Sequence, residues 1–353
     1  MSFTLTSVVD DRLRLEWHAL AEDVGTRFAS RPSYGLSWHR HLGRGPLRVA
    51  TVHRDGRLVA LAPQHQRRRH GERVFRLLGH GLGTVGEALA VDDEAMRDLV
   101  VGLGTAGGVL ELTHLPASSP LLAAILAQGS WRASFTPDDH CPVIDLPEGV
   151  RATDLRGRST LSRAASTRRK LAREGKELRI ETVRTREEFD ARWPDIVATA
   201  ASAQSDRGDD RLDLCAPPHD AFTREFLRQE AENGHLLLWG GTFGGDWGSH
   251  FATLRTGSTA ELWFTRFDPA HGRARPGHLL IESICDHHDD VGVTEVDLLI
   301  GRSGYKKDWQ TREYPVGTLV AIPAGNRTAR ARMAAADRAV SLLRSLAARI
   351  APR

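Results

Sequence analysis

Basic residues surround a single glycine in the segment from Gly272 to His278, which reads GRARPGH. Pro276 favours the first turn of a helix, where its missing N–H needs no partner. A helix that begins there exposes free backbone N–H groups, and the positive end of its dipole, to an anion. This pattern predicts a phosphate-binding turn rather than an ordinary basic surface turn. The residues that would line it are Arg273, Arg275, Gly277 and His278.

A second concentration of charge lies in the segment from Leu161 to Lys176, which we predict to be helical. Positive charge without interleaved aromatic residues suits contact with phosphates or another polyanion rather than base stacking. The simpler interpretation is a solvated helix face. The basic residues of the segment are Arg163, Arg168, Arg169, Lys170, Arg173 and Lys176.

One carboxylate falls inside an apolar run. Asp297 lies between Val293 and Ile300, a run that predicts a strand. A buried carboxylate is costly unless it is paired, and Lys306 and Arg302 are the nearest basic residues in sequence. We expect a structural ion pair first and a contact with a bound ligand second. Lys306 could also contact an anionic ligand or a phosphate.

Length and composition favour a soluble protein of two domains, because 353 residues exceed one domain of usual size and 41% are hydrophobic. A net charge of +3 does not mark the chain for nucleic acid, and we expect no DNA partner. Three separated cysteines, no signal peptide and no apolar run of about 18 residues predict a cytoplasmic protein without a transmembrane segment. No HExxH motif or CxxC pair supports a metal.

The elements that would position these residues form a mixed α/β pattern in both halves. In residues 1–150, alternating strands flank the hairpin signal Asp55-Gly56, and further strands lie near Trp131 and Val143. After a boundary at Pro147 to Gly157, a second domain (151–325) repeats the order of strand, helices, three strands, helix and strand. Its strand Glu261 to Phe267, the helix from Pro276 and the strand Val293 to Ile300 make a parallel βαβ crossover. Residues 326–353 predict a basic helix that packs back on the domain.

The runs FDPAHGRARPGHLLIESI and VDLLIGRSGYKKDW resemble, in this order, two motifs of the CelD/BcsL-type branch of the GNAT acyltransferase superfamily. SWHRHLG, RDGRLVALAPQ and STRRKLAREG resemble the same family, so the resemblance covers nearly the whole chain. It implies two tandem GNAT-like domains, each a twisted mixed sheet flanked by helices, similar to the Fem-type aminoacyl transferases. The superfamily's usual Q/R-x-x-G-x-G/A loop is replaced here by a turn with a proline and one glycine.

The resemblance also implies roles for single residues. The pantetheine arm of a donor would lie between two splayed parallel strands, with Phe267 among the donor-binding residues. Glu261 would be the general base, because many superfamily members carry a carboxylate there. His250 is the alternative, with a side chain whose usual pKa suits neutral pH, and Tyr305 would protonate the leaving group. The structural alternatives are that Glu261 is a surface charge, that His250 is a hydrogen-bonded core residue and that Tyr305 only packs on Trp309.

The predicted reaction is transfer of an acyl group from an acyl-CoA thioester to an amine or hydroxyl of a small molecule or saccharide. The C-terminal domain would be catalytic and the N-terminal one degenerate. In the first alternative the donor is an aminoacyl-tRNA, gripped by Arg168 and Arg169 through its phosphates. In the second, the chain is a non-catalytic factor in envelope or polysaccharide assembly. Independently of the reaction, the alternative to packing for the basic C-terminal helix is peripheral contact with an anionic membrane surface. The acceptor and the oligomeric state are not readable from the sequence.

Overall fold

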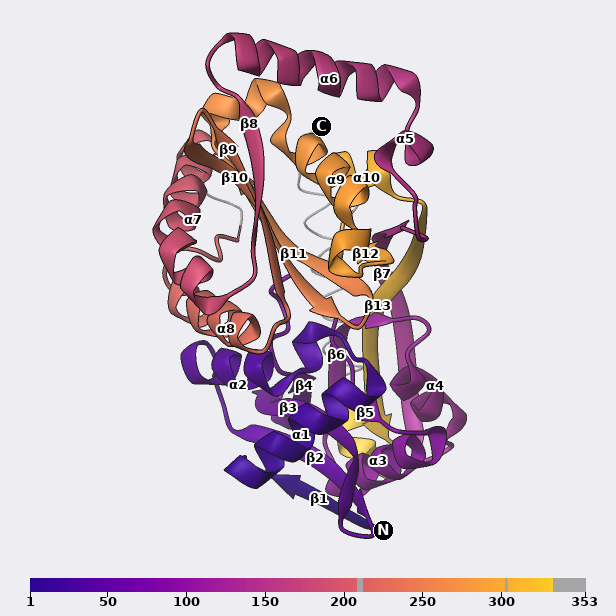
Figure 1. Cartoon of the computed structure of the whole chain (residues 1–353). Coiled ribbons are helices and arrows are strands. Elements are labelled where there is room, and N and C mark those ends of the chain that lie inside the picture. The colour runs from indigo at the N-terminus through magenta and orange to yellow at the C-terminus, as the bar shows by residue number, and fades with distance from the viewer. Residues whose placement is uncertain (208–211, 302–303, 333–353) are drawn as a thin grey trace, which may run out of the picture.

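The computed structural model describes residues 1–207, 212–301 and 304–332. Its strands join one mixed sheet of 13 strands in the order β1-β2-β3-β4-β6-β13-β7-β12-β11-β10-β9-β8, with β5 paired to β3. Figure 1 shows the N-terminal half (residues 1–150) below the C-terminal half, with helices along both parts of the sheet. The predicted fold class, a mixed α/β protein with a twisted mixed sheet flanked by helices, is confirmed.

The two halves run through the same order of elements. The N-terminal half contains β1 (Ser2–Thr6), α1 (Asp11–Val24), η1 (Phe28–Ser30), α2 (Pro32–His41), β2 (Leu47–Arg54), β3 (Arg57–Arg69), β4 (Glu72–Leu77), β5 (Leu89–Ala90), α3 (Asp93–Ala106), β6 (Val109–Pro116), α4 (Pro120–Ala127) and β7 (Trp131–Asp145). The C-terminal half contains α5 (Ala152–Leu155), α6 (Arg158–Arg173), β8 (Leu178–Val183), α7 (Arg186–Arg207), α8 (Asp220–Glu232), β9 (Leu236–Phe243), β10 (Asp246–Thr256), β11 (Thr259–Phe267), η2 (Pro269–Ala274), α9 (Pro276–His287), η3 (Asp289–Val291), β12 (Glu295–Asp297), α10 (Tyr305–Trp309) and β13 (Arg312–Pro323). In each, a strand and helices lead to a three-strand meander, a crossover helix, a parallel strand and a last strand.

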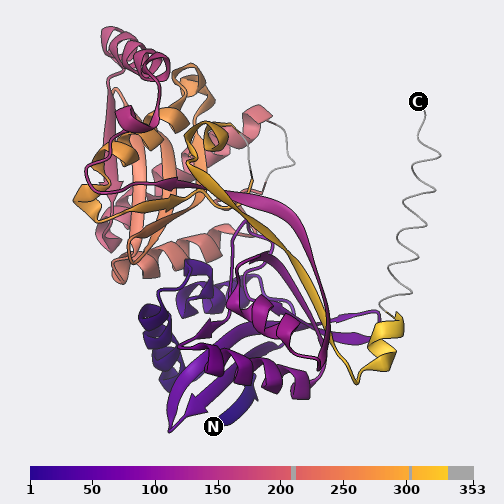
Figure 2. The same ribbon diagram turned by 90° about the vertical axis from the view of Figure 1, so that its right-hand side faces the viewer.

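The last strand of each half pairs with the other half. β13 lies beside β6, with Val316 opposite Pro116 and Ala321 opposite Leu110. β7 lies beside β12, and the two long strands pair with each other from Trp131–Pro323 to Val143–Arg312. Figure 2 shows them running side by side between the two halves. This exchange makes the sheet continuous and prevents either half from completing its sheet alone.

Three predictions of strands were incomplete. The strands expected near Trp131 and Val143 are one strand, β7, and β13 was not predicted at all. The strand expected from Val293 to Ile300 is regular only over Glu295–Asp297. Apolar runs mark burial but do not tell where a strand loses its hydrogen-bonding neighbour. The hairpin at Asp55-Gly56 is confirmed, and both residues have the positive φ that the tight turn requires.

Aromatic side chains hold the two halves together. The rings of Phe28 and Tyr34 from the N-terminal half pack on Phe222, Phe226 and Trp263 from the C-terminal half, with Tyr34 and Phe226 centred 5.0 Å apart. Beside them the buried Arg31 donates to Glu230 across the same interface at 2.6 Å. The relative placement of the halves therefore depends on a buried, densely packed contact.

Little of the predicted C-terminal helix can be assessed. Residues 327–332 are helical, and Arg332 forms an ion pair with Glu72 at 2.7 Å. The rest of the helix predicted between Thr328 and Ile350 lies outside the described residues. Among the helices that the structure describes, none has the length and apolar character needed to cross a bilayer.

The aromatic interface yields a first prediction. Phe226→Ala should lower the free energy of unfolding by about 3–5 kcal/mol, because the fully buried ring leaves a cavity between the halves. Chemical denaturation followed by tryptophan fluorescence measures this loss. Leu126→Ala, at a residue that is 56% exposed, is the control and should change little. Equal losses in both variants would contradict the assigned importance of the interface.

Candidate active site

The parallel strands β11 and β12 part after three paired positions, the last of which joins Glu261 to Asp297. β11 continues to Phe267, whereas the chain after Asp297 turns toward β7, where Leu298 and Gly301 donate their backbone N–H groups to Pro142 and His140. In the part of the chain that the structure describes, β11 therefore has no partner strand on this side beyond Glu261. Such a strand edge presents free N–H and C=O groups to a ligand.

A β-bulge lies where the strands part. Ala252 of β10 pairs with Phe264 and Thr253 pairs with Leu262, so Trp263 is the extra residue. The indole N–H of Trp263 donates to the Leu82 carbonyl of the N-terminal half at 3.0 Å. Bulges bend a strand and redirect its backbone groups. Here the bulge is anchored to the other half, immediately after Glu261.

Glu261 is held in place by the N-terminal half. One carboxylate oxygen accepts the backbone N–H of Phe28 at 2.8 Å, and the other lies 3.2 Å from Nη1 of Arg27. The side chain is buried, and burial raises the pKa of Glu261 to about 7, with Arg27 acting against this rise and Asp297 adding to it. A carboxylate with a pKa near neutrality is suited to accept a proton.

The partner of Asp297 differs from the prediction. Its carboxylate accepts hydrogen bonds from Arg27 at 2.8 Å, from the Tyr314 hydroxyl at 2.6 Å and from the backbone N–H of Leu299 at 2.8 Å. The expected ion pair with Lys306 is not formed, because the Lys306 ammonium donates to the Ile300 carbonyl. Arg302 lies outside the described residues.

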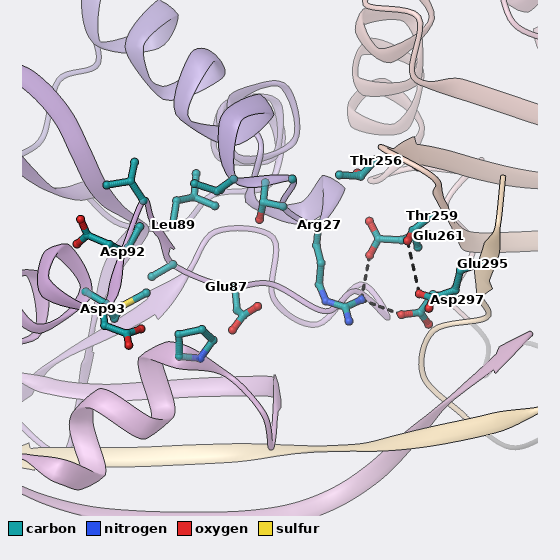
Figure 3. Close-up of a pocket in the computed structure, with 18 residues that line it drawn as sticks. Arg27, Glu87, Leu89, Asp92, Asp93, Thr256, Thr259, Glu261, Glu295 and Asp297 are labelled. Atoms are coloured by element: carbon teal, nitrogen blue, oxygen red, sulfur yellow. Dashed lines mark hydrogen bonds and ion pairs between the residues drawn. The ribbon is translucent and has the colours of Figure 1, made fainter. Parts of the chain in front are cut away.

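A cleft of about 440 Å³ opens beside these carboxylates, between the two halves. Figure 3 shows Arg27 between Glu261 and Asp297, with Glu87 and Asp93 further along the cleft. Six acidic residues and one basic residue, Arg27, are among its described lining residues. Arg54 and Arg312 neutralise two of the acids, Asp92 and Glu295, from outside. The cleft is nevertheless acidic, and the residues that contribute its carboxylates are Glu87, Asp92, Asp93, Glu261, Glu295 and Asp297.

The turn that we predict to bind an anion consists of η2 and the start of α9. Asp268 caps η2 by accepting the Ala270 N–H at 2.8 Å, which accounts for the Asp-Pro pair in the sequence. Pro276 begins α9, and the preceding residue, Arg275, has a left-handed φ of 54°. Non-glycine residues in this conformation are strained and are concentrated at functional sites. The first turn of α9 carries no acidic residue.

A groove of about 330 Å³ lies between α6 and the first turns of α9 and α10. Arg156, Arg163, Arg275 and His278 line it with Trp309, whereas Arg273 and Phe267 do not. The guanidinium of Arg156 stacks on Trp309 at 4.9 Å, and its Nε and Nη2 have no hydrogen-bond partner among the described residues. Trp309 donates to Nδ1 of His278 at 3.2 Å, and burial with neighbouring cations lowers the pKa of His278. The groove can accept an anion.

Tyr305 lies at the same end of α9. Its ring stacks on Phe251 at 5.3 Å and packs against the core cluster that also contains Trp309, and a Cβ on Gly277 would lie 3.3 Å from it. The glycine thus makes room for the tyrosine ring on the first turn of the helix. Burial raises the pKa of Tyr305, and its hydroxyl has no hydrogen-bond partner among the described residues.

His250 is fully buried and lies away from these groups. Its ring contacts Phe264 and Trp247, and neither ring nitrogen has a partner in the described part of the chain. Burial lowers the pKa of His250 to about 3, so the ring is neutral and weakly basic at pH 7. This geometry favours Glu261 over His250 as a proton acceptor.

The basic helix is only partly free for a ligand. Arg168 forms an ion pair with Glu282 of α9 at 2.8 Å, so it fastens α6 to the body. Arg169 is exposed, as are Arg163, Lys170 and Arg173. Figure 1 shows α6 at the far end of the C-terminal half, above α9.

Sequence reasoning missed three residues of this region: Arg27, Arg156 and Tyr314. Arg27 lies 234 positions from Glu261, and no local pattern links them. Arg156 lies in the predicted domain boundary from Pro147 to Gly157, where nothing in the local sequence marks an isolated arginine as functional. Among the described residues, no group of three or more His, Cys, Asp or Glu could hold a metal ion.

A comparison with protein families finds a match within the C-terminal half. Residues 158–307 match the family model of the acetyltransferase (GNAT) domain, which includes β11, α9, β12 and the start of α10. Over these residues the C-terminal half is therefore similar to a GNAT acetyltransferase domain. No curated protein matches the chain.

Solved structures share the fold over almost the whole chain. FemX is 10% identical with a TM-score of 0.62, covering 91% of this chain and 97% of its own. The C-terminal domain of a putative lysylphosphatidylglycerol synthetase from Agrobacterium fabrum is 16% identical with a TM-score of 0.59, covering 93% and 97%. A conserved protein of unknown function from Bacteroides thetaiotaomicron is 6% identical with a TM-score of 0.59, covering 91% and 100%. At these identities the likeness concerns the fold alone.

Proposed function

We propose that the protein is an acyltransferase whose single active site lies where β11 and β12 part. The observation that carries this proposal is Glu261, a buried carboxylate with a pKa of about 7, at the last paired position of the two strands. A free strand edge and an acidic cleft meet beside it. The match to the GNAT acetyltransferase domain supports the reaction class. The motif order further supports membership of the CelD/BcsL-type branch.

The donor would be an acyl-CoA that enters from the α9 side. Its phosphates would bind the first turn of α9 with Arg275, His278 and Arg156, and its pantetheine arm would follow the free edge of β11. The seven residues of strand from Glu261 to Phe267 span about 20 Å, a length comparable to that of an extended pantetheine arm. Free N–H groups of β11 would stabilise the oxyanion of the tetrahedral intermediate.

The acceptor would enter from the cleft between the halves, where Glu261 can remove its proton. Tyr305 would then protonate the leaving thiolate. The carboxylates of the cleft favour an amine that binds as a cation over a neutral hydroxyl. In this proposal residues 151–325 form the catalytic domain, and residues 1–150 complete the acceptor cleft.

The base assignment gives a direct test. Glu261→Gln should lower kcat by about 10²–10⁴-fold, the usual contribution of a general base. In the wild type, activity should rise with pH through about 7, because the raised pKa keeps Glu261 protonated at lower pH. Turnover of acetyl-CoA with cadaverine, followed as free thiol, measures both. Glu177→Gln, at an exposed residue, is the control.

Two outcomes would contradict the proposal. Unchanged turnover in Glu261→Gln would exclude this residue as the base, and His250→Ala would then be measured. Absence of turnover in the wild type with every acyl donor would favour the non-catalytic assembly factor.

The donor assignment predicts a loss of coenzyme A binding on charge reversal in the groove. Arg275→Glu should weaken acetyl-CoA binding by roughly tenfold to a hundredfold, because a hydrogen bond to a charged group contributes about 1.5–3 kcal/mol. Isothermal titration calorimetry measures it, with Arg57→Glu as a control at an exposed arginine of the N-terminal half.

The exposed basic residues of α6 favour one second candidate, an aminoacyl-tRNA donor. Binding of aminoacyl-tRNA that weakens steeply with salt, and further in the Arg169→Glu, Arg173→Glu variant, would support it. Such binding, without any affinity for acetyl-CoA, would overturn the coenzyme A assignment.

The acidic cleft predicts the class of acceptor. Replacing Glu87 and Asp93 by Gln and Asn should raise the KM for cadaverine by about two- to fivefold for each charge removed, as expected for partly exposed charge pairs. Turnover of a neutral alcohol of the same length should not change. Asp11→Asn, at an exposed aspartate, is the control. A KM that responds equally for amine and alcohol would show that charge does not select the acceptor.

A further inference from the structure

One guanidinium group joins the two carboxylates at the point where the strands part. Nη1 of Arg27 lies 2.8 Å from Oδ2 of Asp297 and 3.2 Å from Oε1 of Glu261. Both carboxylates are at least 98% buried on their side chains, and Arg27 is 24% exposed toward the cleft. Figure 3 shows the arginine reaching across from the N-terminal half to both strands.

The two carboxylates depend on Arg27 to different degrees. Asp297 also accepts hydrogen bonds from Tyr314 and from the Leu299 N–H, so its charge is well satisfied without the arginine. Glu261 has the Phe28 N–H as its other hydrogen-bond donor. Removal of Arg27 would leave Glu261 as a buried carboxylate beside another negative charge, which favours its protonated form.

We propose that Arg27 is a positioning residue of acyl transfer, supplied by the N-terminal half, that holds Glu261 in the ionised state in which it accepts the acceptor's proton. The inference rests on the proposed function and assigns part of the catalytic apparatus to the half without the donor site. The proton passes from the acceptor nitrogen to Glu261 as the new C–N bond forms. The thioester C–S bond breaks, the coenzyme A thiolate leaves and takes a proton from Tyr305, and Arg27 is unchanged.

The position of Arg27 follows from the fold around it. Gly25 ends α1 in a left-handed conformation, and Phe28, directly after Arg27, packs in the aromatic interface between the halves. The guanidinium stacks on the ring of Tyr314 at 5.0 Å. The other charged or titratable groups around this pair come from several elements, and they are Arg31, Glu87, Cys141, Glu295, Lys306, Arg312 and Tyr314. Of these, Arg31 is bound to Glu230 and Lys306 to a carbonyl, so neither replaces Arg27.

The experiment is a pH profile of kcat/KM for acetyl-CoA and cadaverine. The rising limb is the part of this profile in which activity increases with pH. In Arg27→Met it should shift to higher pH by roughly one unit or more, the usual effect of a neighbouring charge. Activity should fall about tenfold at pH 7 and recover near pH 9. Arg27→Lys, which keeps the charge, should hold the limb close to its wild-type position, and Arg57→Met is the matched control at an exposed arginine.

A merely structural role would lower activity by the same factor at every pH, and an unmoved limb in a folded Arg27→Met protein would overturn the inference. If the methionine variant does not fold in a thermal unfolding assay, Arg27→Gln takes its place, because glutamine retains a hydrogen bond to Asp297. The Glu261→Gln variant distinguishes a failure of the proposed base from a failure of the role proposed for Arg27. A limb that persists in Glu261→Gln contradicts the proposed base, whereas a limb that vanishes there but does not move in Arg27→Met contradicts only the role of Arg27.

Discussion

The parting of β11 from β12 is the constraint on which the site depends. The two strands pair in parallel over three residues and then part, and we call this point the fork. Beyond the fork the backbone groups of one strand have no partner strand, and the side chains of Glu261 and Asp297 lie at the fork itself. Both point to the side where the N-terminal half lies, so they are buried when the halves meet. Burial of two adjacent carboxylates requires a cation. Arg27 of the N-terminal half supplies this cation, so the charges of the two carboxylates are balanced from across the interface between the halves.

The exchange of the last strands explains how the interface stays fixed. β13 pairs with β7 along its whole length, and each of the two strands completes the sheet of the other half. A hinge between the halves would break this ladder, so the cleft between them has walls of defined position. The aromatic cluster around Phe226 and the buried pair of Arg31 with Glu230 act in the same direction. Residues hundreds of positions apart can then meet within hydrogen-bond distance.

Local patterns in the sequence were sufficient to predict the helix start that we propose as the donor side of the site. Pro276 and the basic turn predicted the start of α9, and the Asp-Gly pair predicted the hairpin at Asp55, because each depends on a few adjacent residues. The acceptor side could not be predicted in this way. Arg27 has no sequence signal, since its partners lie on strands of the other half, and Asp297 was assigned a partner from its own neighbourhood. The strand β13 was missed because both of its partner strands, β6 and β7, belong to the N-terminal half. Non-local contacts are the common cause of these errors.

The N-terminal half contains a fork of its own, and its chemistry explains why we place one site in the chain rather than two. β4 and β6 pair in parallel at Val74–Val109 and Phe75–Leu110, and the next residues are Arg76 and Glu111, which form an ion pair with each other. The fork is thus neutralised within the half and leaves no carboxylate to act as a base. The helix that follows, α3, begins with Asp92 as its cap and Asp93 and Glu94 in its first turn. These charges oppose an anion at the helix terminus, where α9 presents arginines instead. In the proposed function, the N-terminal half therefore contributes through the residues that it extends across the interface.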